Sequence, residues 1–388
     1  MLAIITSHPI QYQAPLWREL ARAGVKFEVW FLTPHAVQSS FDREFGQTFA
    51  WDVNLLEGYP HRFLPVKTGW RLDRFRGIRL DTSWAEEFRA RGVTHVWVEG
   101  WRFLEFWRAV QAARAGGLQV WLRGESHDLA PEPFWRRLVK RPLLDWLFQR
   151  VDRFLCIGAA NRRYYGRAGV PEAKLCAAPY GVDNDRFAKA AAAFRPRRAE
   201  LRAHWSIAPD AYVVLFCGKL IAKKRPLDLV AAARLAPALA GRPVHLLFAG
   251  DGELVAALNQ ALAGRGGPAG TITGFLNQTQ IPGAFAAADC LVLPSDYGET
   301  WGLVVNEALA SGLPAIASDR CGCAEDLGLR QGRAHVFACG DVADLARSLR
   351  DVADRPPPPA LLQLVVDAHD PRRTVETVQQ LLGGAPNP

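Results

Sequence analysis

The feature that most constrains the fold of this chain is an alternation of short apolar runs with helical patterns, which occurs twice. In the first half, runs rich in β-branched and aromatic residues are LAIITS (2–7), KFEVWFL (26–32), THVWVE (94–99), LQVWLRG (118–124) and DRFLCIG (152–158). Similar runs in the second half are AYVVLFCG (211–218), VHLLFAG (244–250), TITGF (271–275), DCLVLPS (289–295) and LPAIASD (313–319). Such alternation is typical of parallel strands joined by crossover helices. The sequence therefore predicts two Rossmann-like α/β domains.

The length of the chain agrees with two domains, because 388 residues exceed the size at which a single core usually keeps growing. The alternation is interrupted over 179–205, where a Gly- and Asp-rich loop is followed by an Ala/Arg-rich segment. We therefore expect one domain over 1–182 and a second over 183–365. The Pro-rich stretch DRPPPPA (354–360) ends the regular pattern. Residues 366–388 are expected to form a tail that packs back on the first domain.

Two glutamates stand out in DYGETWGLVVNEALASG (296–312), where Glu299 and Glu307 are eight positions apart. On one continuous helix, eight residues turn through about 800°, which leaves the two carboxylates about 80° apart and poorly placed to act together. Gly302 lies between them, however, and the strand pattern just upstream ends in a Pro-Ser turn. We therefore expect a helix that begins near Gly302, with Glu299 on the loop before it and Glu307 in its second turn.

Further polar stretches leave the predicted strands of the second half at the same edge. FCGKLIAKKRP (216–226) turns at Gly218 and presents Lys219 and Lys224, and FAGDGE (248–253) turns between two glycines. In an open parallel sheet, ligands bind beyond the carboxyl ends of the strands, and helix N-termini there offer N–H groups to anions. The sequence therefore predicts an anion-binding site at this edge.

In order and spacing, these stretches resemble the retaining glycosyltransferases of family four, also called glycosyl transferases group 1. These enzymes have the GT-B fold, an α/β architecture of two Rossmann-like domains facing each other across a cleft. The resemblance covers nearly the whole second domain. It rests on the combination of GKL…K, GDG, the two glutamates and EALASGLPAIASD (307–319), because the glutamate spacing alone is not specific. It implies transfer of a sugar from a nucleoside-diphosphate-sugar donor to a hydroxyl acceptor, with retention of the anomeric configuration.

The chemistry of such a donor accounts for the basic residues. The diphosphate gains negative charge as the glycosidic bond breaks, so the site needs fixed cations and oriented N–H groups. The resemblance implies that Lys219 and Lys224 hold the diphosphate, with the backbone of Gly302, Leu303 and Val304 adding donors. The family more often has Arg at the first of these positions, and a lysine supplies the charge without the bidentate geometry. As a bare charge run, the basic residues after the strand would instead form a solvated face.

The same resemblance assigns the rest of the donor. Glu307 would accept hydrogen bonds from the ribose, and the backbone of Phe275 and Leu276 would contact the base. Glu299 would bind sugar hydroxyls and stabilise positive charge on the anomeric carbon, which makes it a catalytic residue. The alternative for Glu307 is an acid on the helix surface. No side chain is an obvious base near the reactive face, so front-face attack is expected, with the leaving phosphate taking the acceptor proton.

The first half carries the acceptor-side candidates. LRGESHD (122–128) follows a strand, and His127 stands where related enzymes have a histidine facing the donor sugar, so we expect it to be catalytic. Arg123 either approaches the acceptor or orders this loop, and a lone histidine after a strand is otherwise a structural hydrogen-bonder. TSHPIQYQAP (6–15) departs from the Gly-rich loop common in the family. Its polar residues expected near the acceptor are His8, Gln11, Tyr12 and Gln13.

Charge and tryptophan are divided unequally along the chain. Residues 1–180 carry 26 Lys and Arg against 18 Asp and Glu, and eleven of the thirteen tryptophans precede residue 150. This composition is compatible with peripheral contact with an anionic membrane, and equally with a core that uses Trp. The segment 133–150 offers the same choice, since its apolar residues recur near helical spacing among arginines until Pro142 interrupts them.

Several classes of partner and cofactor are not expected. The seven cysteines are an odd number without a second Cys/His pair at ligand spacing, which favours buried thiols over a metal site. DND (183–185) spells a metal motif of another glycosyltransferase fold but lies in an interdomain-type loop, so we expect no metal. No cofactor and no nucleic-acid partner are expected; the donor is a co-substrate. The acceptor is a glycan, a lipid-linked sugar or a small molecule.

Without a leader or a long uncharged apolar run, a cytoplasmic location is predicted, with peripheral contact at the inner face of the membrane as a further option. The predicted role is cell-surface glycan or glycolipid synthesis. Two alternatives stay open at this point: a nucleotide-sugar epimerase or phosphorylase of the same fold, and a non-catalytic binder of sugar nucleotides. An epimerase would need acid/base residues on both faces of the sugar, and a cofactor-using phosphorylase would need a Schiff-base lysine; neither is identifiable.

Overall fold

The computed structural model describes residues 1–35, 37, 40–42, 47–49, 51–130, 133–327 and 335–383. The chain divides into two compact units. Unit 1 comprises Met1–Ser40, Asn54–Tyr180 and Pro371–Pro388, and unit 2 comprises Phe41–Val53 and Gly181–Asp370. This division differs from the one drawn from the sequence, at 1–182, 183–365 and 366–388, in one substantial respect. Phe41–Val53, which lies in the first half of the sequence, belongs to unit 2.

Unit 1 is built on a seven-stranded parallel sheet with the order β5-β2-β1-β6-β7-β8-β9. Its strands are β1 (Leu2–Thr6), β2 (Phe27–Phe31), β5 (His61–Phe63), β6 (His95–Glu99), β7 (Gln119–Arg123), β8 (Arg153–Cys156) and β9 (Leu175–Ala177). The chain starts in the middle of the sheet, builds outward on one side, and returns to build the other side from β6. The topological switch point of unit 1 therefore lies between β1 and β6, where such sheets bind ligands at the carboxyl edge.

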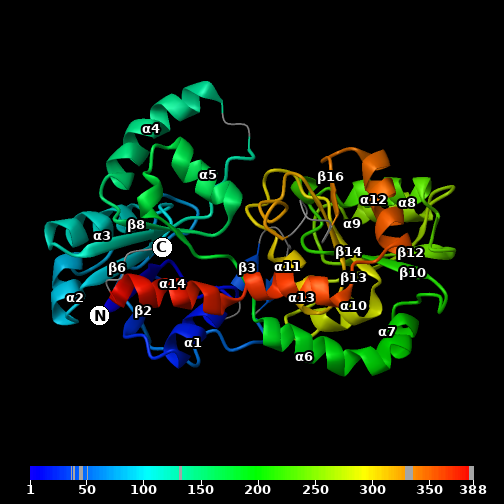
Figure 1. Ribbon diagram of the computed structural model, residues 1–388, viewed down its shortest axis with the longest axis horizontal. Coiled ribbons are helices and arrows are strands. Elements are labelled where there is room, and N and C mark those ends of the chain that lie inside the picture. The colour runs from blue at the N-terminus through cyan, green and yellow to red at the C-terminus, as the bar shows by residue number, and fades with distance from the viewer. Residues whose placement is uncertain are drawn as a thin grey trace. The chain divides into compact units, whose positions relative to one another are not determined.

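Two apolar clusters cover the faces of this sheet because successive side chains of a strand point to opposite sides. On β1, Ala3 and Ile5 join one cluster, and Leu2 and Ile4 join the other. The first cluster takes in α2 (Trp84–Ala90), α3 (Leu104–Ala115) and the end of α4 (Phe134–Phe148), and α5 (Ala159–Arg167) packs with it. The second takes in α1 (Ala14–Arg22) and α14 (Pro371–Gly383), so the last described helix of the chain packs on unit 1 (Figure 1).

The core of unit 1 absorbs much of the tryptophan excess of the first half. The tryptophans that are fully buried are Trp17, Trp30, Trp97 and Trp121. Four others pack against the first cluster while partly exposed: Trp70, Trp101, Trp107 and Trp146. Core packing therefore explains these residues without a membrane. Among the described residues, no helix is both long and apolar enough to span a bilayer.

Unit 2 repeats the same topology. Its strands are β10 (Tyr212–Cys217), β11 (Ala238–Leu239), β12 (Arg242–Ala249), β13 (Ala269–Gly274), β14 (Cys290–Leu293), β15 (Ala315–Ser318) and β16 (His335–Phe337). The parallel strands run β13-β12-β10-β14-β15-β16, and the short β11 pairs antiparallel with the start of β12. The switch point of unit 2 therefore lies between β10 and β14.

Helices cover both faces of this second sheet as well. Those that pack in the main apolar cluster are α8 (Pro226–Leu235), α9 (Val255–Ala263) and α12 (Val342–Asp354). Those that contact one another in a separate group are α6 (Asn184–Phe194), α7 (Arg198–His204), α10 (Ile281–Ala287), α11 (Leu303–Ala310) and α13 (Pro359–Ala368). Short 3-10 turns are Glu172–Lys174, Arg195–Arg197 and Ala222–Lys224. The Phe41–Val53 segment holds β4 (Gln47–Phe49), which pairs with β3 (Ser40–Asp42).

All ten strands predicted from the apolar runs are present within two residues of the expected bounds. The missed strands are too short to show an alternating pattern: β11 has two residues, and β3, β4, β5, β9 and β16 have three each. One expectation was wrong, because α4 continues through Pro142 where an interruption was predicted. In α4, Leu147 is buried and Trp146 stacks on Trp107 at 5.8 Å between ring centroids, whereas Leu143 is exposed.

Candidate functional site

The predicted donor-site residues lie on unit 2 beyond the carboxyl ends of its strands. Lys219 follows β10, and Phe275 and Leu276 follow β13. Glu299 lies in the loop after β14, and α11 with Glu307 follows that loop. Because neighbouring parallel strands end at the same edge, the topology brings these segments to the ligand-binding edge of the sheet. The predicted helix start is confirmed, since α11 begins at Leu303 with Gly302 as its N-cap.

Glycines let the first two loops of this site pack backbone against backbone. The Gly218 N–H donates to the Ala249 carbonyl at 3.0 Å, and the Leu220 N–H donates to the Asp251 carbonyl at 2.8 Å. A Cβ atom on Gly250 would lie 1.9 Å from the Gly218 oxygen, closer than any real contact. The GKL and GDG stretches are thus one interlocked unit, and this close approach accounts for the glycines that the sequence shows there.

Lys224 and Glu299 contact each other directly. The Lys224 Nζ donates to Glu299 Oε2, and the Ser295 hydroxyl lies 3.3 Å from the same oxygen. Both side chains are mostly buried, at 19% and 13% exposed. The next residue, Arg225, has a left-handed backbone with φ of 50°, which is rare for a residue with a side chain and is often found at functional sites. Two residues predicted to hold different parts of the donor therefore neutralise each other.

The start of α11 is shaped by Gly302. Its φ of 103° lies in the region that glycine tolerates, and a Cβ atom there would lie 2.5 Å from the Leu293 side chain. The buried Trp301 indole N–H donates to the Asn306 side chain at 2.9 Å and secures the first turn. The backbone N–H groups of Leu303 and Val304 lie in that turn, where no preceding helical carbonyl is available to them. This geometry is suited to hydrogen-bonding an anion.

Glu307 is buried inside unit 2, which rules out the interpretation of a surface acid. Only 3% of it is exposed, and this burial raises the pKa of its carboxyl to about 7. The positive charge of Arg186 and a hydrogen bond from the Gln278 side chain act in the opposite direction. Arg186 in turn donates to the Gln278 side chain at 2.6 Å and to its carbonyl at 3.0 Å. Neither residue was predicted from the sequence, because the contact joins α6 to the β13–α10 turn.

On unit 1, the loop that carries His127 is held by α5. The Asn161 side chain donates to the carbonyls of Gly124 at 3.0 Å and Ser126 at 2.6 Å. Gly124 is closely packed, since a Cβ atom there would lie 2.3 Å from the Trp101 ring. The Leu129 N–H donates to the Nδ1 atom of His127 at 3.2 Å. A neutral His127 therefore carries its proton on Nε2.

The loop after β1 carries the other acceptor-side candidates. Gln11 and Tyr12 are half-buried, and the His8 ring packs edge-on against His35 at 5.1 Å between centroids. Burial, with the nearby His35 and Arg102, lowers the pKa of His8 to about 4. The His8 Nδ1 atom lies 2.8 Å from the Ser7 hydroxyl. His8 is therefore a neutral hydrogen-bonding group at physiological pH.

Gln13 and Arg123 meet at Glu99, a residue that the sequence did not single out. Gln13 Nε2 donates to Glu99 at 3.2 Å, and an Arg123 nitrogen lies 4.0 Å from its other oxygen. Burial raises the pKa of Glu99 to about 7, against the opposing effect of Arg123. Glu99 Oε1, Arg123 Nε and Gln13 Oε1 are buried without a hydrogen-bond partner. Glu99 ends β6 at the switch point, so the topology rule would have found it once the strand order was known.

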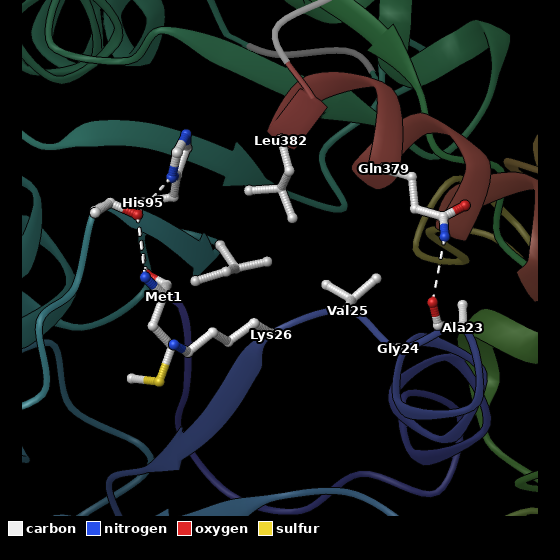
Figure 2. A pocket seen from close by; sticks show the side chains of 10 residues that line it. Met1, Ala23, Gly24, Val25, Lys26, His95, Gln379 and Leu382 are labelled. Atoms are coloured by element: carbon white, nitrogen blue, oxygen red, sulfur yellow. Dashed lines mark hydrogen bonds between the residues drawn. The ribbon is translucent and has the colours of Figure 1, made fainter.

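A cavity of about 390 Å³ in unit 1 lies at the other edge of the sheet (Figure 2). Leu2 and His95, which open β1 and β6, line it together with Lys26, and Gln379 of α14 donates to the Ala23 carbonyl beside it. This edge holds the amino ends of the strands, away from the carboxyl edge with its loops. The cavity is therefore distinct from the predicted acceptor side.

Two buried cysteines lie next to the loop that carries Glu299. Cys321 and Cys323 are fully buried, and the Cys323 N–H donates to the Trp301 carbonyl at 2.9 Å. Gly322 between them approaches the Thr300 backbone so closely that a Cβ atom would lie 1.9 Å from its oxygen. Over the described ranges, the side chains form no group of three or more His, Cys, Asp or Glu that would hold a metal ion. The buried thiols and the close approach at Gly322 pack the CGC stretch against the backbone of Thr300 and Trp301.

Residues 197–362 match the model of the family described as glycosyl transferases group 1. The match covers 166 of the 388 residues, and we call this part the group 1 region. The group 1 region covers β10 to α12 and hence Lys219, Lys224, Glu299 and Glu307. Unit 1 lies outside the matched range, so its candidates do not rest on this match.

Curated relatives match about half of the chain. A GDP-mannose-dependent alpha-(1-6)-phosphatidylinositol dimannoside mannosyltransferase of Mycobacterium tuberculosis is 30% identical over 213 residues, which are 53% of this chain and 50% of the relative. A D-inositol 3-phosphate glycosyltransferase of Streptomyces scabiei is 35% identical over 199 residues, 49% of this chain and 43% of the relative. The chain thus spans about half the length of the curated relatives that it matches.

Solved structures establish the fold of the whole chain. The Anabaena protein HepE in complex with UDP and glucose superposes with a TM-score of 0.69 at 16% identity, over 99% of this chain and 98% of that one. WaaG, a glycosyltransferase involved in lipopolysaccharide biosynthesis, gives 0.61 at 17% identity, over 99% and 100%. The chain therefore has the GT-B fold, as the sequence predicted, with two parallel-sheet α/β domains.

Proposed function

We propose that the protein is a retaining glycosyltransferase that transfers a sugar from a nucleoside-diphosphate-sugar to a hydroxyl group of an acceptor. The observation that carries the proposal is the Lys224–Glu299 contact beside the N-terminus of α11. It combines a cation, a carboxylate and backbone donors at the ligand-binding edge of a group 1 domain. A nucleoside diphosphate needs the first and third of these, and an anomeric carbon that develops positive charge needs the second.

The Lys224–Glu299 contact also suggests how the site responds to donor. In the structure, each side chain satisfies the charge of the other. Donor binding would exchange this contact for two new ones: Lys224, with Lys219, would hold the diphosphate, and Glu299 would bind the sugar hydroxyls. The interlocked GKL and GDG loops keep Lys219 on a rigid backbone while this exchange occurs. Because lysines and backbone N–H groups supply the positive charge, the proposed reaction uses no metal cofactor.

The buried Glu307 fits the proposed role of binding the ribose. A carboxyl with a pKa near 7 exists in both forms at neutral pH, and ribose hydroxyls that donate to it favour the charged form. Nucleoside diphosphates are therefore expected to bind more tightly as pH rises through 7. Arg186 and Gln278 would position the carboxyl.

Unit 1 is proposed to serve the acceptor. Gln13, Glu99 and Arg123 form a buried polar group with unsatisfied hydrogen-bonding atoms, which suits a hydroxyl-bearing molecule. His127 is proposed to contact the donor sugar. By their names, the curated relatives act on an inositol phosphate and on a phosphatidylinositol dimannoside. These names support a glycolipid or a cell-surface glycan as the product. They also support peripheral contact with a membrane as the route to a lipid-linked acceptor.

A donor panel tests this function. UDP-, GDP- and ADP-sugars are incubated with the full chain and a mixture of sugar, inositol phosphate and lipid-linked acceptors, with and without EDTA. Transfer with retained anomeric configuration, unaffected by EDTA, is expected for one donor class. The Lys224→Met and Glu299→Gln variants should both lose transfer, whereas Lys189→Met on α6, the control, should retain it. Interconversion of free donor epimers without transfer would indicate an epimerase, and binding without any reaction would indicate a non-catalytic binder.

A further inference from the structure

The Phe41–Val53 segment is the part of the molecule that neither the group 1 match nor the sequence analysis connects with the donor site. In the sequence it lies between β2 and β5, which pair with each other in the unit 1 sheet. In space it belongs to unit 2. The chain therefore leaves unit 1 after Ser40, contributes a short segment to unit 2, and returns at Asn54. Its described end, Trp51 and Asp52, contacts the turn between β13 and α10.

Asp52 is bonded to this turn through both its backbone and its side chain. Its carboxylate accepts hydrogen bonds from the Thr279 N–H at 3.1 Å and from the Thr279 hydroxyl. Its own N–H donates to the Asn277 side-chain oxygen at 3.4 Å. A single exposed aspartate with this set of contacts fixes the end of the segment to one place on unit 2. The residue next to it, Trp51, is thereby held in a defined position.

The turn that receives Asp52 is itself well ordered by hydrogen bonds. The Gln280 side chain accepts from the Asn277 N–H at 3.0 Å, and the Asn277 carbonyl accepts from the N–H of Gln280 at 2.9 Å. The Asn277 side chain also accepts from the Gln278 N–H at 2.9 Å. Gln278 in turn donates to Glu307, the proposed ribose ligand. Asp52 is therefore attached to the structure that leads from the proposed base contact to the proposed ribose contact.

Trp51 and Phe275 form an aromatic corner at the start of this turn. Their ring centroids lie 6.4 Å apart and their planes are inclined by 59°. Both side chains are half-buried, and Phe275 is the residue whose backbone is expected to contact the nucleobase. A flat heterocycle can stack on the face of one ring while its edge meets the second, a geometry that aromatic groups favour. Base–aromatic stacking of this kind tolerates different bases, and neighbouring polar groups then select among them.

We propose that Trp51 forms a wall of the nucleobase pocket of the donor and that Asp52 holds it there by bonding the β13–α10 turn. The proposal rests on the proposed function, since it assigns a further residue to the same donor. Trp51 would contact the base directly and so add affinity for the nucleoside part of the donor, and Asp52 would be a positioning residue. The first half of the chain would then supply part of the donor site itself.

Binding of nucleotides to the full-length protein tests this assignment by isothermal titration calorimetry. UDP, GDP, ADP and inorganic pyrophosphate are titrated into the wild type and into the variants Trp51→Leu, Trp51→Phe and Asp52→Ala. Trp51→Leu should weaken binding of the preferred nucleoside diphosphate by about tenfold, the loss of one stacking contact. Pyrophosphate, which has no base, should bind the wild type and this variant equally. Trp51→Phe should retain most of the affinity for the nucleoside diphosphate. Asp52→Ala should lose less of this affinity than Trp51→Leu and should bind pyrophosphate as the wild type does.

Trp205→Leu is the matched control. Trp205 is also half-buried and on unit 2, but it precedes β10 and so lies at the amino edge of the sheet. Its replacement should leave both nucleotide and pyrophosphate affinity unchanged. A second measurement needs no variant: photolabelling of the wild type with 5-azido-UDP, or with the azido analogue of the preferred base, should modify the peptide that contains Trp51.

The outcomes separate the assignment from the function on which it rests. Equal nucleotide affinity in wild type and Trp51→Leu, equal weakening of pyrophosphate and nucleotide, or photolabel confined to other peptides would overturn the role of Trp51 while leaving the glycosyltransferase intact. A wild type that binds pyrophosphate but shows no preference for any nucleoside diphosphate would overturn the proposed donor and, with it, the assignment.

Discussion

The Glu307→Gln substitution should make unit 2 more stable at alkaline pH, although it removes a residue of the proposed site. Glu307 is 3% exposed, and its pKa rises from 4.5 to about 7 because burial disfavours the charged form. Glutamine keeps the shape and the capacity to hydrogen-bond with Gln278 but carries no charge. The substitution therefore isolates the cost of holding a buried carboxylate.

The size of the effect follows from the two pKa values. A difference of about 2.5 between the folded and unfolded pKa of Glu307 corresponds to about 3 kcal/mol. Between pH 4.5 and 7 the folded protein binds more protons at this site than the unfolded chain, so the free energy of unfolding falls as pH rises. Below pH 4.5 the cost is absent, and above pH 7 it is fully present. About 2.5 kcal/mol of it should develop between pH 5 and pH 8.

Urea unfolding of wild type and Glu307→Gln at pH 5 and pH 8 measures this difference. The variant should gain about 2.5 kcal/mol relative to the wild type between the two pH values. Glu200→Gln is the control, because it removes the same charge from a side chain that is 69% exposed on the same unit. Its stability relative to the wild type should change little. A Glu307→Gln difference that is the same at both pH values would refute the reasoning, since the carboxyl would then not be costly to ionise.

Three further predictions concern other parts of the two units. Gly250→Ala should lower the free energy of unfolding, measured in urea, by at least about 1–3 kcal/mol, because its Cβ would lie 1.9 Å from the Gly218 oxygen. Gly166→Ala is the control, since it has open space around it on α5 and should cost nothing. Equal losses in the two variants would show that the GKL and GDG loops are not interlocked. Arg123→Met should raise the pKa of Glu99 above its value of about 7, because the positive charge that favours the ionised carboxylate is lost. Carbon NMR of the Glu99 carboxyl follows this titration. An unchanged titration would mean that Arg123 does not act on Glu99. His8 should stay neutral down to about pH 4 in an imidazole NMR titration, and a midpoint near 6.5 would place it in water.

The sequence predicted the residues that local patterns reveal. The strands carry apolar runs, and the helix at α11 has Gly302 before it, so both the sheet edges and the positions of Glu299 and Glu307 could be placed. It could not show that Glu299 pairs with Lys224, because the two are 75 residues apart and meet only through the strand order. The same holds for Glu99, whose importance follows from its place at the β1–β6 switch point.

Burial was the second quantity that the sequence could not supply. From the sequence, an acid on the helix surface remained an alternative for Glu307. Only the packing of α6 and the β13–α10 turn shows that its side chain is buried. The segment ending in Trp51 and Asp52 was missed for a related reason. Nothing in its composition indicates that it crosses to unit 2, because its partners Asn277 and Thr279 lie more than 200 residues further along the chain.

The placement of Phe41–Val53 has a consequence for how such chains can be recombined. A hybrid of two such chains joined at Tyr180–Gly181 and Asp370–Pro371 would take Gly181–Asp370 from one parent. Its Phe41–Val53 segment, which also belongs to unit 2, would come from the other parent. The Asp52 bonds to Asn277 and Thr279 would then join residues of different ancestry, and a parent with other residues at these positions would lose the attachment. Donor preference in such hybrids should follow the parent of the second unit only when Phe41–Val53 is transferred with it. If the proposal holds, two separate stretches of the sequence encode the donor site, and a breakpoint chosen from the bounds of the group 1 region alone would divide it.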